Sequence, residues 1–318
     1  MKKERLKSQR QVNLLLDSGA YAAWRRGEVI NVYDYIEYIK RYEDQIEHCV
    51  NLDIIPGVHK TYPTPEEVED SAKRSYENQQ IMKAHGLSPI PVFHQGESFS
   101  WLKRYMDDGE PYIGISPLLD IQGWKGADPD VWLDQAFDFV TDDHGYPLVK
   151  THGFGLNSLK YLKRYPWYSV DATSWAQMGN FGRILCPSYR NGKPDYLGTP
   201  NYIHVTDVTV RRDCIFTSAR DKAKDQFGNL GRAQQDQVIH FVTHECGLSM
   251  THVRYSGDAR RKCVIIFWKK VFEAVDNVPR FKYKTRWRLL DTLKDGKSAK
   301  RNTTEIYSGG RVEASSGL

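Results

Sequence analysis

Two stretches of the sequence place a carboxylate where an apolar run ends. Asp171 follows residues 168–170, and Asp17 follows the leucine run of residues 14–16 and precedes Ser18 and Gly19. Paired carboxylates can serve as a nucleophile and as a general acid and base. The pattern therefore indicates Asp171 as a candidate nucleophile and Asp17 as its candidate acid partner.

Other polar residues also fall at the ends of expected strands, namely Asp53, His94 with Gln95, Ser116 and His152. In a closed (β/α)8 barrel the carboxyl ends of all strands meet at one face, whereas a doubly wound sheet shares its site among fewer of them. The sequence therefore favours an α/β fold, a (β/α)8 TIM-like barrel with an insertion and a basic C-terminal extension.

The expected elements alternate through the first half of the chain. Apolar runs predict strands over residues 11–19, 49–53, 89–96, 112–116, 150–155 and 168–171, and helical spacing or capping residues predict helices over 31–48, 64–86, 98–107, 130–141 and 157–164. No hairpin signal separates these strands, so a parallel sheet is expected.

The pattern weakens after Trp175. Residues 183–186 are expected to form a seventh strand, and residues 187–232 an excursion from the barrel. Residues 234–246 have helical spacing, the β-branched and aromatic composition of residues 264–268 is typical of a strand, and residues 269–275 fit a closing helix. We therefore expect a catalytic barrel over residues 1–277 and a basic extension with a polar tail over residues 278–318.

Charge is distributed unevenly along the 318 residues. Residues 1–175 contain 26 acidic and 20 basic side chains, and residues 176–318 contain 14 acidic and 25 basic ones. A basic half suggests a polyanionic partner, although a solvated basic surface would have the same composition. No apolar run is long enough for a membrane helix and the N-terminus lacks a secretory signal, so an intracellular, cytoplasmic protein without a membrane partner is expected.

Cations and aromatic residues alternate over residues 280–288. Such a segment can neutralise phosphates while its rings stack or pack, although an edge strand protected by charges would look the same. The candidate nucleic-acid-binding residues are Arg280, Lys282, Lys284, Arg286 and Arg288.

The five cysteines are scattered and form no CxxC or CxC pair, so neither a disulfide framework nor a zinc ribbon is signalled. A zinc site would have to combine Cys246 with His244 and Cys263. The expectation is that the protein uses no metal and no other cofactor.

Taken together, the strand ends resemble the tRNA-guanine transglycosylase superfamily. Five of its motifs have counterparts in the right order: Asp17-Ser18-Gly19-Ala20 for Asp-Ser-Gly-Gly, His94-Gln95-Gly96-Glu97 for Val-Gln-Gly-Gly, Tyr112-Ile113-Gly114-Ile115 for Tyr-X-Ile-Gly-Gly, Gly153-Phe154-Gly155 for Gly-Val-Gly, and Ser169-Val170-Asp171 for Gly-Val-Asp. The sequence around Asp171 is most similar to a phage-type branch that acts on DNA.

The resemblance implies an enzyme that exchanges guanine in DNA for a free 7-deazaguanine derivative through a covalent Asp171–sugar intermediate, in the host cytoplasm if the protein is phage-encoded. A target nucleotide must leave the base stack, which suits aromatic neighbours such as Tyr21, Trp24 or Trp175. The implied substrate-binding residues, besides the catalytic Asp171 and Asp17, are Ser18, Gly19, Asp53, Gln95, Gly96 and Gly114.

The chain departs from the family pattern in two places. It lacks the CxCxxC zinc motif of the tRNA enzymes, and Ser174 occupies their usual nucleophile position, which leaves Asp171 as the carboxylate of this strand. Three other functions remain open: a tRNA-guanine transglycosylase, a metal-dependent barrel hydrolase using the aspartates and histidines, and a nucleic-acid-binding scaffold.

Structural roles are the alternative for each candidate residue. Asp17 and Asp53 can shape turns, and Asp171 can cap a following helix. His94 and His152 are typical of packed, hydrogen-bonded histidines and are not included in the catalytic set.

Overall fold

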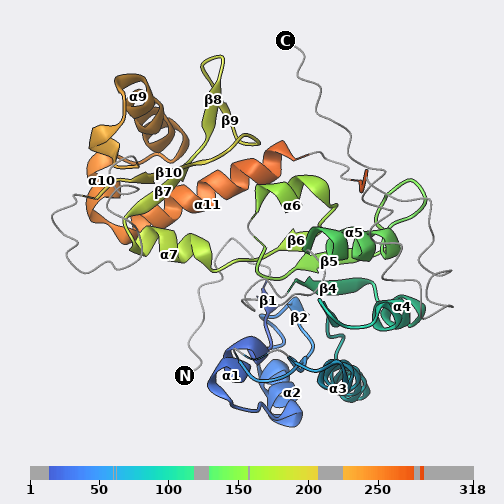
Figure 1. Cartoon of the computed structure of the whole chain (residues 1–318). Helices are drawn as coiled ribbons and strands as arrows, with labels where there is room; N and C mark the ends of the chain where they lie inside the picture. Colours follow the sequence, from blue (N-terminus) through green and yellow to red (C-terminus); the bar gives the residue numbers. More distant parts are fainter. Residues whose placement is uncertain are drawn as a thin grey trace, which may run out of the picture. The chain divides into compact units, whose positions relative to one another are not determined.

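The computed structural model of the chain describes residues 14–59, 61, 63–117, 129–156, 158–206, 225–275 and 280–282. These residues form a mixed α/β structure with parallel sheets (Figure 1). They divide into two compact units. The first contains the described residues up to Phe154, Tyr165–Val170 and residues 280–282, and the second contains those of Gly155–Arg164 and of the segment from Asp171 to Val275.

The strands of the first unit follow one another in chain order and run parallel. They are β1 (Leu15–Leu16), β2 (His48–Cys49), β3 (Val92–His94), β4 (Tyr112–Ser116), β5 (Lys150–Gly153) and β6 (Ser169–Val170). β1 pairs with β2, and β3 to β6 form a four-stranded sheet. A parallel bridge between Val50 and Ile90 joins the segments that follow β2 and precede β3. The predicted parallel pairing is therefore confirmed for these six strands.

Helices connect these strands: α1 (Ala20–Arg26), α2 (Val32–Arg41), α3 (Pro65–Ala84), α4 (Phe99–Asp107) and α5 (Pro129–Phe139). Asn31 caps α2 by accepting from the Tyr33 N–H, and Thr64 and Glu67 form a reciprocal capping box at the start of α3. Such caps satisfy amides that have no partner within the helix. The cap at Asn31 was expected from the sequence, and the capping box at Thr64 adds to the start expected there.

The helices bury their apolar faces against the strands and one another. α2 packs beside α3, and α4 beside α5 (Figure 1). One core cluster joins α2 to β1, β2 and α3 through residues that include Ile36, Cys49 and Met82. Under the four-stranded sheet, the ring of Phe93 stacks on that of Trp132 with centroids 5.4 Å apart. Burial of each such side chain stabilises the fold by about 1.5–3 kcal/mol.

The second unit combines helices with two antiparallel strand pairs. Its elements are α6 (Leu159–Arg164), α7 (Ser174–Asn180), β7 (Arg183–Cys186), β8 (Ser188–Arg190), β9 (Lys193–Asp195), β10 (Asn201–His204), a 3-10 turn (Phe227–Asn229), α9 (Arg232–His240) with a π-helical continuation (Phe241–Glu245), α10 (Met250–Tyr255) and α11 (Gly257–Ala274). β7 forms where a strand was expected, but it runs antiparallel to β10.

The prediction of a strand over residues 264–268 is wrong, because these residues belong to α11. Cys263, Val264, Phe267 and Val271 are all buried, and their spacing places them on one helical face. β-branched residues have a weak preference for strands, and packing of this face against α7 and β7 outweighs it. The expected closing helix over residues 269–275 is the second half of α11.

The excursion over residues 187–232 contains a hairpin that was not predicted. β8 and β9 pair antiparallel across Asn191 and Gly192, whose φ values are 52° and 75°. An Asn-Gly pair is the usual signal for a two-residue turn with positive φ at both positions. The hairpin was therefore readable from the sequence.

A buried arginine ties three helices of the second unit together. Arg260, on α11, donates from Nε to the carbonyl oxygen of Gly179 at 2.7 Å and from Nη1 to the carbonyl oxygens of Val253 and Arg254. α7 and α11 approach closely at Gly179, where a Cβ would lie 2.6 Å from Arg261 Cγ. The guanidinium thus satisfies carbonyl groups at the ends of α7 and α10.

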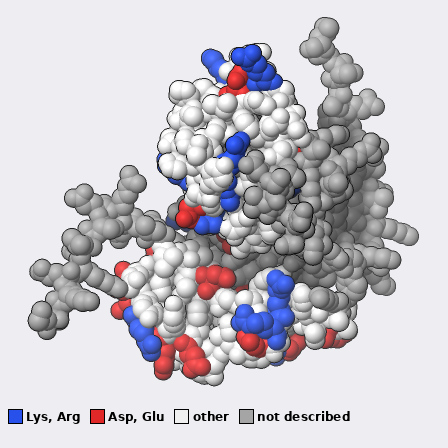
Figure 2. Space-filling view, turned by 90° about the vertical axis from the view of Figure 1, so that its left-hand side faces the viewer, with Lys and Arg blue, Asp and Glu red and all other residues white. Residues whose placement is uncertain are grey.

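No described helix is both long and apolar enough to cross a membrane. On the face shown in Figure 2, acidic and basic side chains lie next to one another over the helices of the first unit. Exposed ion pairs of the first unit include Arg26 with Glu28 and Arg74 with Asp70. Exposed pairs of this kind contribute about 0–1 kcal/mol each.

Gly145 provides a test of how the segment around Phe281 is held. Its φ is 83°, and a Cβ there would lie 2.1 Å from the Phe281 carbonyl oxygen, whereas Gly109 has a φ of 74° and open space. Both alanine variants are strained by the positive φ, and only Gly145→Ala must also displace the backbone of Phe281. We expect Gly145→Ala to lose about 1–3 kcal/mol more in urea unfolding than Gly109→Ala. Equal losses would show that Phe281 does not depend on this contact.

Candidate functional site

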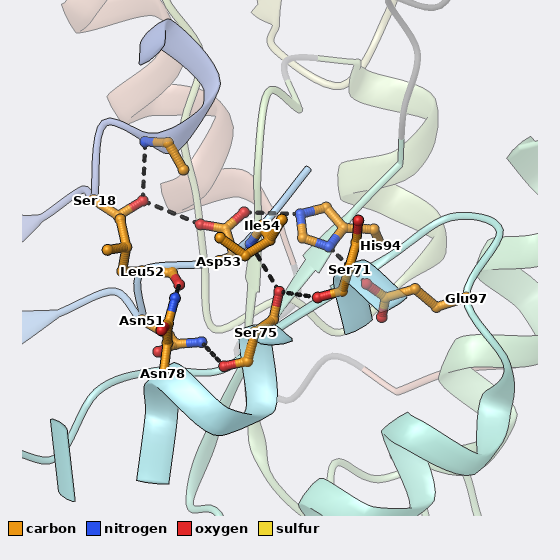
Figure 3. A network of polar contacts seen from close by, with 11 residues as sticks. Ser18, Asn51, Leu52, Asp53, Ile54, Ser71, Ser75, Asn78, His94 and Glu97 are labelled. Atoms are coloured by element: carbon orange, nitrogen blue, oxygen red, sulfur yellow. Dashed lines mark hydrogen bonds and ion pairs between the residues drawn. The ribbon is translucent and has the colours of Figure 1, made fainter. Parts of the chain in front are cut away.

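The candidate site is a hydrogen-bonded chain of four buried side chains in the first unit (Figure 3). The Ser18 hydroxyl donates to Asp53 Oδ1 at 3.1 Å, and Asp53 Oδ2 lies 2.9 Å from His94 Nε2. On the other side of the imidazole ring, His94 Nδ1 lies 2.9 Å from Glu97 Oε1. The four residues are between 2% and 8% exposed. A titratable cluster buried to this extent is typical of a functional site.

Each member of this chain lies just beyond or at the end of a parallel strand. Ser18 follows β1, Asp53 lies beyond β2, and His94 is the last residue of β3. Glu97 follows in the turn, where Gly96 has a φ of 102° and the Glu97 N–H donates to the His94 carbonyl oxygen. Adjacent parallel strands end at the same edge of the sheet, so residues far apart in sequence meet there.

Helix α3 fixes the backbone on both sides of Asp53 (Figure 3). The Ile54 N–H donates to Ser75 Oγ at 2.7 Å, and Asn78 Nδ2 donates to the Leu52 carbonyl oxygen at 2.8 Å. Asn51 Nδ2 donates to the carbonyl oxygen of Ser75 at 2.8 Å. Three hydrogen bonds with α3 therefore hold the segment that contains Asp53.

The imidazole of His94 is positively charged at neutral pH. Burial by itself lowers the pKa of His94, but the hydrogen bonds to Asp53 and Glu97 and the charges of both carboxylates outweigh it and raise the pKa to about 10. Burial raises the pKa of Glu97, and the hydrogen bond to His94 opposes that shift. Glu97 Oε2 has no hydrogen-bond partner among the described residues. The chain thus contains an imidazolium held between two carboxyl groups.

This arrangement gives Asp53 the character of a fixed acceptor. One carboxylate oxygen receives the Ser18 hydroxyl and the other the His94 N–H, and each carboxylate oxygen can accept a further bond. A ligand with neighbouring N–H groups, such as the Watson–Crick edge of guanine, matches such an acceptor. The network holds the carboxylate in place before any ligand arrives, which lowers the entropy cost of recognition.

The other residues expected near Asp53 differ in accessibility. Asp17 is exposed, and Gly19, with a φ of 74°, is the N-cap residue of α1. Gln95 is buried, and its backbone N–H donates to the Ser116 carbonyl oxygen at 3.0 Å. Gly96 is exposed.

Gly114 has a packing role in the sheet. It is buried on β4, and a Cβ at this position would lie 2.5 Å from Phe154 Cε2 and 3.3 Å from the Pro91 carbonyl oxygen. The absence of a side chain therefore makes room for the Phe154 ring. A role for the Gly114 backbone at a substrate remains a prediction.

Asp171 lies in the second unit, where its carboxylate is bound by a motif glycine. The Gly155 N–H donates to Asp171 Oδ1 at 2.7 Å, and Asp171 is exposed. Gly155 has a φ of 67°. The N-cap of the following helix is Thr173, and Ser174 is the first residue of α7. Two of the motifs noted in the sequence, at Gly155 and at Asp171, are therefore in direct contact.

Sequence reasoning missed the two residues that complete the buried chain. His94 was left out of the catalytic set as a packed histidine, and Glu97 was noted only as a motif position. A signal was available, because His and Glu three residues apart around Gly96 directly follow a buried strand. The sequence does not show that His94 pairs with Asp53.

A second polar cluster lies between β4, β5 and β6. Ser169 Oγ is 2.5 Å from Tyr112 Oη and 2.5 Å from His152 Nδ1. The Lys150 ammonium lies 4.4 Å from the centroid of the Tyr168 ring. This cluster confirms that His152 is buried and hydrogen-bonded, as expected from the sequence.

The expected aromatic neighbours are partly exposed. Tyr21 and Trp175 are 40% and 37% exposed. Trp24 is held in place, because its Nε1–H donates to the Gly57 carbonyl oxygen at 2.9 Å and its ring meets that of His59 edge-on. Tyr21 and Trp24 contact each other in α1, with ring centroids 5.8 Å apart.

The basic segment is described only at its beginning. Arg280 and Lys282 are exposed, whereas Phe281 between them is 1% exposed and packs against Phe137 and Tyr165. The ring of Phe281 therefore belongs to the core of the first unit and is not available for stacking on a base. Lys284, Arg286 and Arg288 lie outside the described residues.

Among the described residues, no group of three or more His, Cys, Asp or Glu side chains has the arrangement of a metal site. Cys49, Cys186, Cys246 and Cys263 are free thiols in the interior, and Cys214 lies outside the described residues. A hydrogen bond to Cys263, together with burial, raises the pKa of Cys246. His244, the third residue of the conceivable zinc set, is exposed.

Comparisons with known proteins add no assignment. Neither a scan against protein-family models nor searches of curated proteins and of solved structures found a match to the chain.

The charge of His94 can be tested by titration. Replacing Asp53 by Asn removes one anionic partner, so we expect the pKa of His94 to fall by about one unit or more from its value near 10. Histidine-selective nitrogen NMR between pH 6 and 10.5 measures this shift. Asp34→Asn, at an exposed position of α2, is the matched control. A His94 pKa that is the same in all three proteins would contradict the proposed pairing.

The same titration has a consequence for stability. Because the pKa of His94 is higher in the folded chain than the ordinary 6.5, its stabilising contribution is complete below about pH 6.5 and is lost as pH rises through about 10. In the Asp53→Asn variant the pKa of His94 is expected to be lower, so the stabilising contribution of His94 is expected to be lost at lower pH.

Proposed function

We propose that the chain is a base-exchange glycosyltransferase, a pentosyltransferase that replaces guanine in DNA by a 7-deazaguanine derivative. The observation that carries the proposal is the chain of Ser18, Asp53, His94 and Glu97. It joins the Asp-Ser-Gly motif to the His-Gln-Gly-Glu motif through a carboxylate positioned as an acceptor. Both motifs resemble those of the tRNA-guanine transglycosylase superfamily.

In this proposal Asp53 and Gln95 recognise the base. The Asp53 carboxylate accepts from the ring N–H and the exocyclic amine of guanine or of its 7-deaza analogue, which share this edge. The hydrogen bond from the imidazolium of His94 holds the Asp53 carboxylate in one orientation, so His94 acts as a positioning residue. Ser18, Gly19, Gly96 and Gly114 contribute the surrounding backbone of the base site.

The reaction we propose is a double displacement at the sugar. Asp171 attacks C1′, the C1′–N9 bond breaks, and the electron pair leaves with the guanine, which takes a proton from Asp17. The incoming base then loses its N9 proton to Asp17 and attacks C1′, the ester bond breaks, and the Asp171 carboxylate is regenerated. Atoms and charge balance without water or a cofactor, as base exchange requires.

The fold supports a (β/α)8 barrel over residues 1–277 as part of this proposal. The chain-order parallel pairing from β1 to β6, with a helix after each strand, is the sequence of elements with which such a barrel begins. The basic residues 278–318 would then form an extension that binds the polyanion. Absence of the CxCxxC motif of the tRNA enzymes from the sequence favours DNA over tRNA.

The proposal predicts which polymer is modified. The purified protein is incubated with DNA, and separately with tRNA, in the presence of radiolabelled 7-deazaguanine precursors. We expect label in DNA, and we expect Asp171→Asn to reduce its incorporation by at least about a thousandfold while DNA binding persists. Ser174→Ala, at the family's usual nucleophile position, is the control and should retain exchange. Label in tRNA alone would show that the substrate is RNA and contradict the proposed DNA substrate. Full turnover of the Asp171→Asn variant would show that Asp171 is not the nucleophile.

The basic segment predicts a salt dependence. Each phosphate contact contributes a slope of about −0.9 to the plot of log affinity against log salt concentration. Replacing Arg280, Lys282, Lys284, Arg286 and Arg288 by Gln should weaken DNA binding and flatten this slope. The matched control replaces five cations of α2 to α4, namely the exposed Lys40, Arg41, Lys73 and Arg74 and the half-buried Lys103. If both variants change the slope equally, the segment has no special role in DNA binding.

A further inference from the structure

The second unit contains a cavity of about 310 Å³ that none of the predicted site residues lines. Its walls come from β10, α9 and the residues around β8 (Figure 1). The floor is apolar and includes Cys186, Ile203 and Val238, which are buried. A volume at the lower end of the range for ligand sites suits a single small molecule or one residue of a polymer.

Two tyrosine rings line this cavity. The Tyr189 hydroxyl donates to the Gln237 carbonyl oxygen at 3.0 Å and lies 3.3 Å from His240 Nδ1, so its ring is held against α9. Tyr202 is 46% exposed. Pro187 and Pro200 also line the cavity with ring carbons. Such ring surfaces favour a planar ligand.

The polar groups of the cavity are amides and one carboxylate. The side chains of Gln234, Gln237 and Asp225 line it and make no hydrogen bond or ion pair with the described residues. Carboxamides offer a donor and an acceptor side by side, and a carboxylate accepts from amines. No Lys, Arg or His is among the lining residues, so the cavity does not match an anion.

A nucleobase is a ligand of this kind, because it is planar, uncharged and bordered by neighbouring hydrogen-bond donors and acceptors. Glutamine pairs with adenine in this way, and carboxylates accept from the amine of cytosine. Cations adjoin the lining residues in sequence, since Arg190 follows Tyr189 and Arg232 lies two residues before Gln234, and both are exposed. These side chains can meet the phosphates that flank a base seated in the cavity.

We infer that the second unit binds one unstacked base of the DNA strand in this cavity, in addition to the base that is exchanged. The inference rests on the proposed function for its ligand class, and it assigns a role in choosing the DNA sequence to residues outside the catalytic motifs. Aromatic stacking together with amide hydrogen bonds is the usual way in which proteins hold single bases.

The test measures binding of fluorescein-labelled ten-nucleotide single strands to the full-length protein by fluorescence anisotropy. One set carries the four natural bases and the other is abasic throughout. We expect Gln234→Ala combined with Gln237→Ala, and separately Tyr202→Ala, to weaken binding of the natural strands about tenfold and to leave the abasic strand unaffected. Gln235→Ala on the same helix is the control, since its amide donates to the Phe227 and Leu230 carbonyl oxygens.

Thermal unfolding of each variant establishes that the chain is folded. Equal affinity of the cavity variants and the parent protein for the natural strands would overturn the inference, as would an equal loss for natural and abasic strands. Base exchange is assayed in parallel, so the two proposals can fail separately. If the cavity variants lose affinity only for strands that carry bases and the protein has no exchange activity, the inference about the cavity is supported and the proposed base exchange is rejected. If the protein exchanges bases and the cavity variants show no such loss of affinity, the proposed base exchange is supported and the inference about the cavity is rejected.

Discussion

The arrangement at the carboxyl ends of β1 to β3 depends on one buried positive charge. His94 is 2% exposed, and an imidazolium so far from water is stable only because a carboxyl group lies 2.9 Å from each ring nitrogen. Removal of either partner leaves a buried charge without compensation, which costs far more than a surface ion pair contributes. Loss of any one of these three side chains therefore destabilises the other two. Their contacts also link the segment after β2 to the turn after β3.

The fold supplies the precision that this ionic chain requires. Parallel strands bring residues 18, 53 and 94 to one edge of the sheet, and α3 then fixes the backbone around Asp53 through Ser75 and Asn78. α3 is in turn defined by its Thr64 capping box and by Met82 in the core. The geometry of the site therefore depends on the packing of α3, and the position of α3 depends on its local capping signals.

Much of the fold of the first unit could be predicted because its signals are local. Asn31 caps the helix that it was expected to cap, α3 begins within one residue of its expected start, and β4 has the expected bounds. In the second unit, long-range packing decides, so residues 264–268 form part of a helix despite their strand-like composition. Of the candidate site, Ser18 and Asp53 could be named from the strands that they follow, and their function stays a prediction. The pairing of His94 with Asp53 spans 41 residues and leaves no local trace in the sequence.

His94 and Glu97 are the first and last residues of the His-Gln-Gly-Glu motif, and neither would be stable in the interior alone. A lone imidazolium or a lone carboxylate would be buried without a partner, which is unfavourable. Together they form an ion pair across Nδ1 of His94, and Nε2 is left to bind Asp53. His94 and Glu97 therefore act as one unit, a charged support behind Asp53. A support of this kind holds an acceptor in place without using its remaining acceptor sites, which is what the proposed recognition of a base requires.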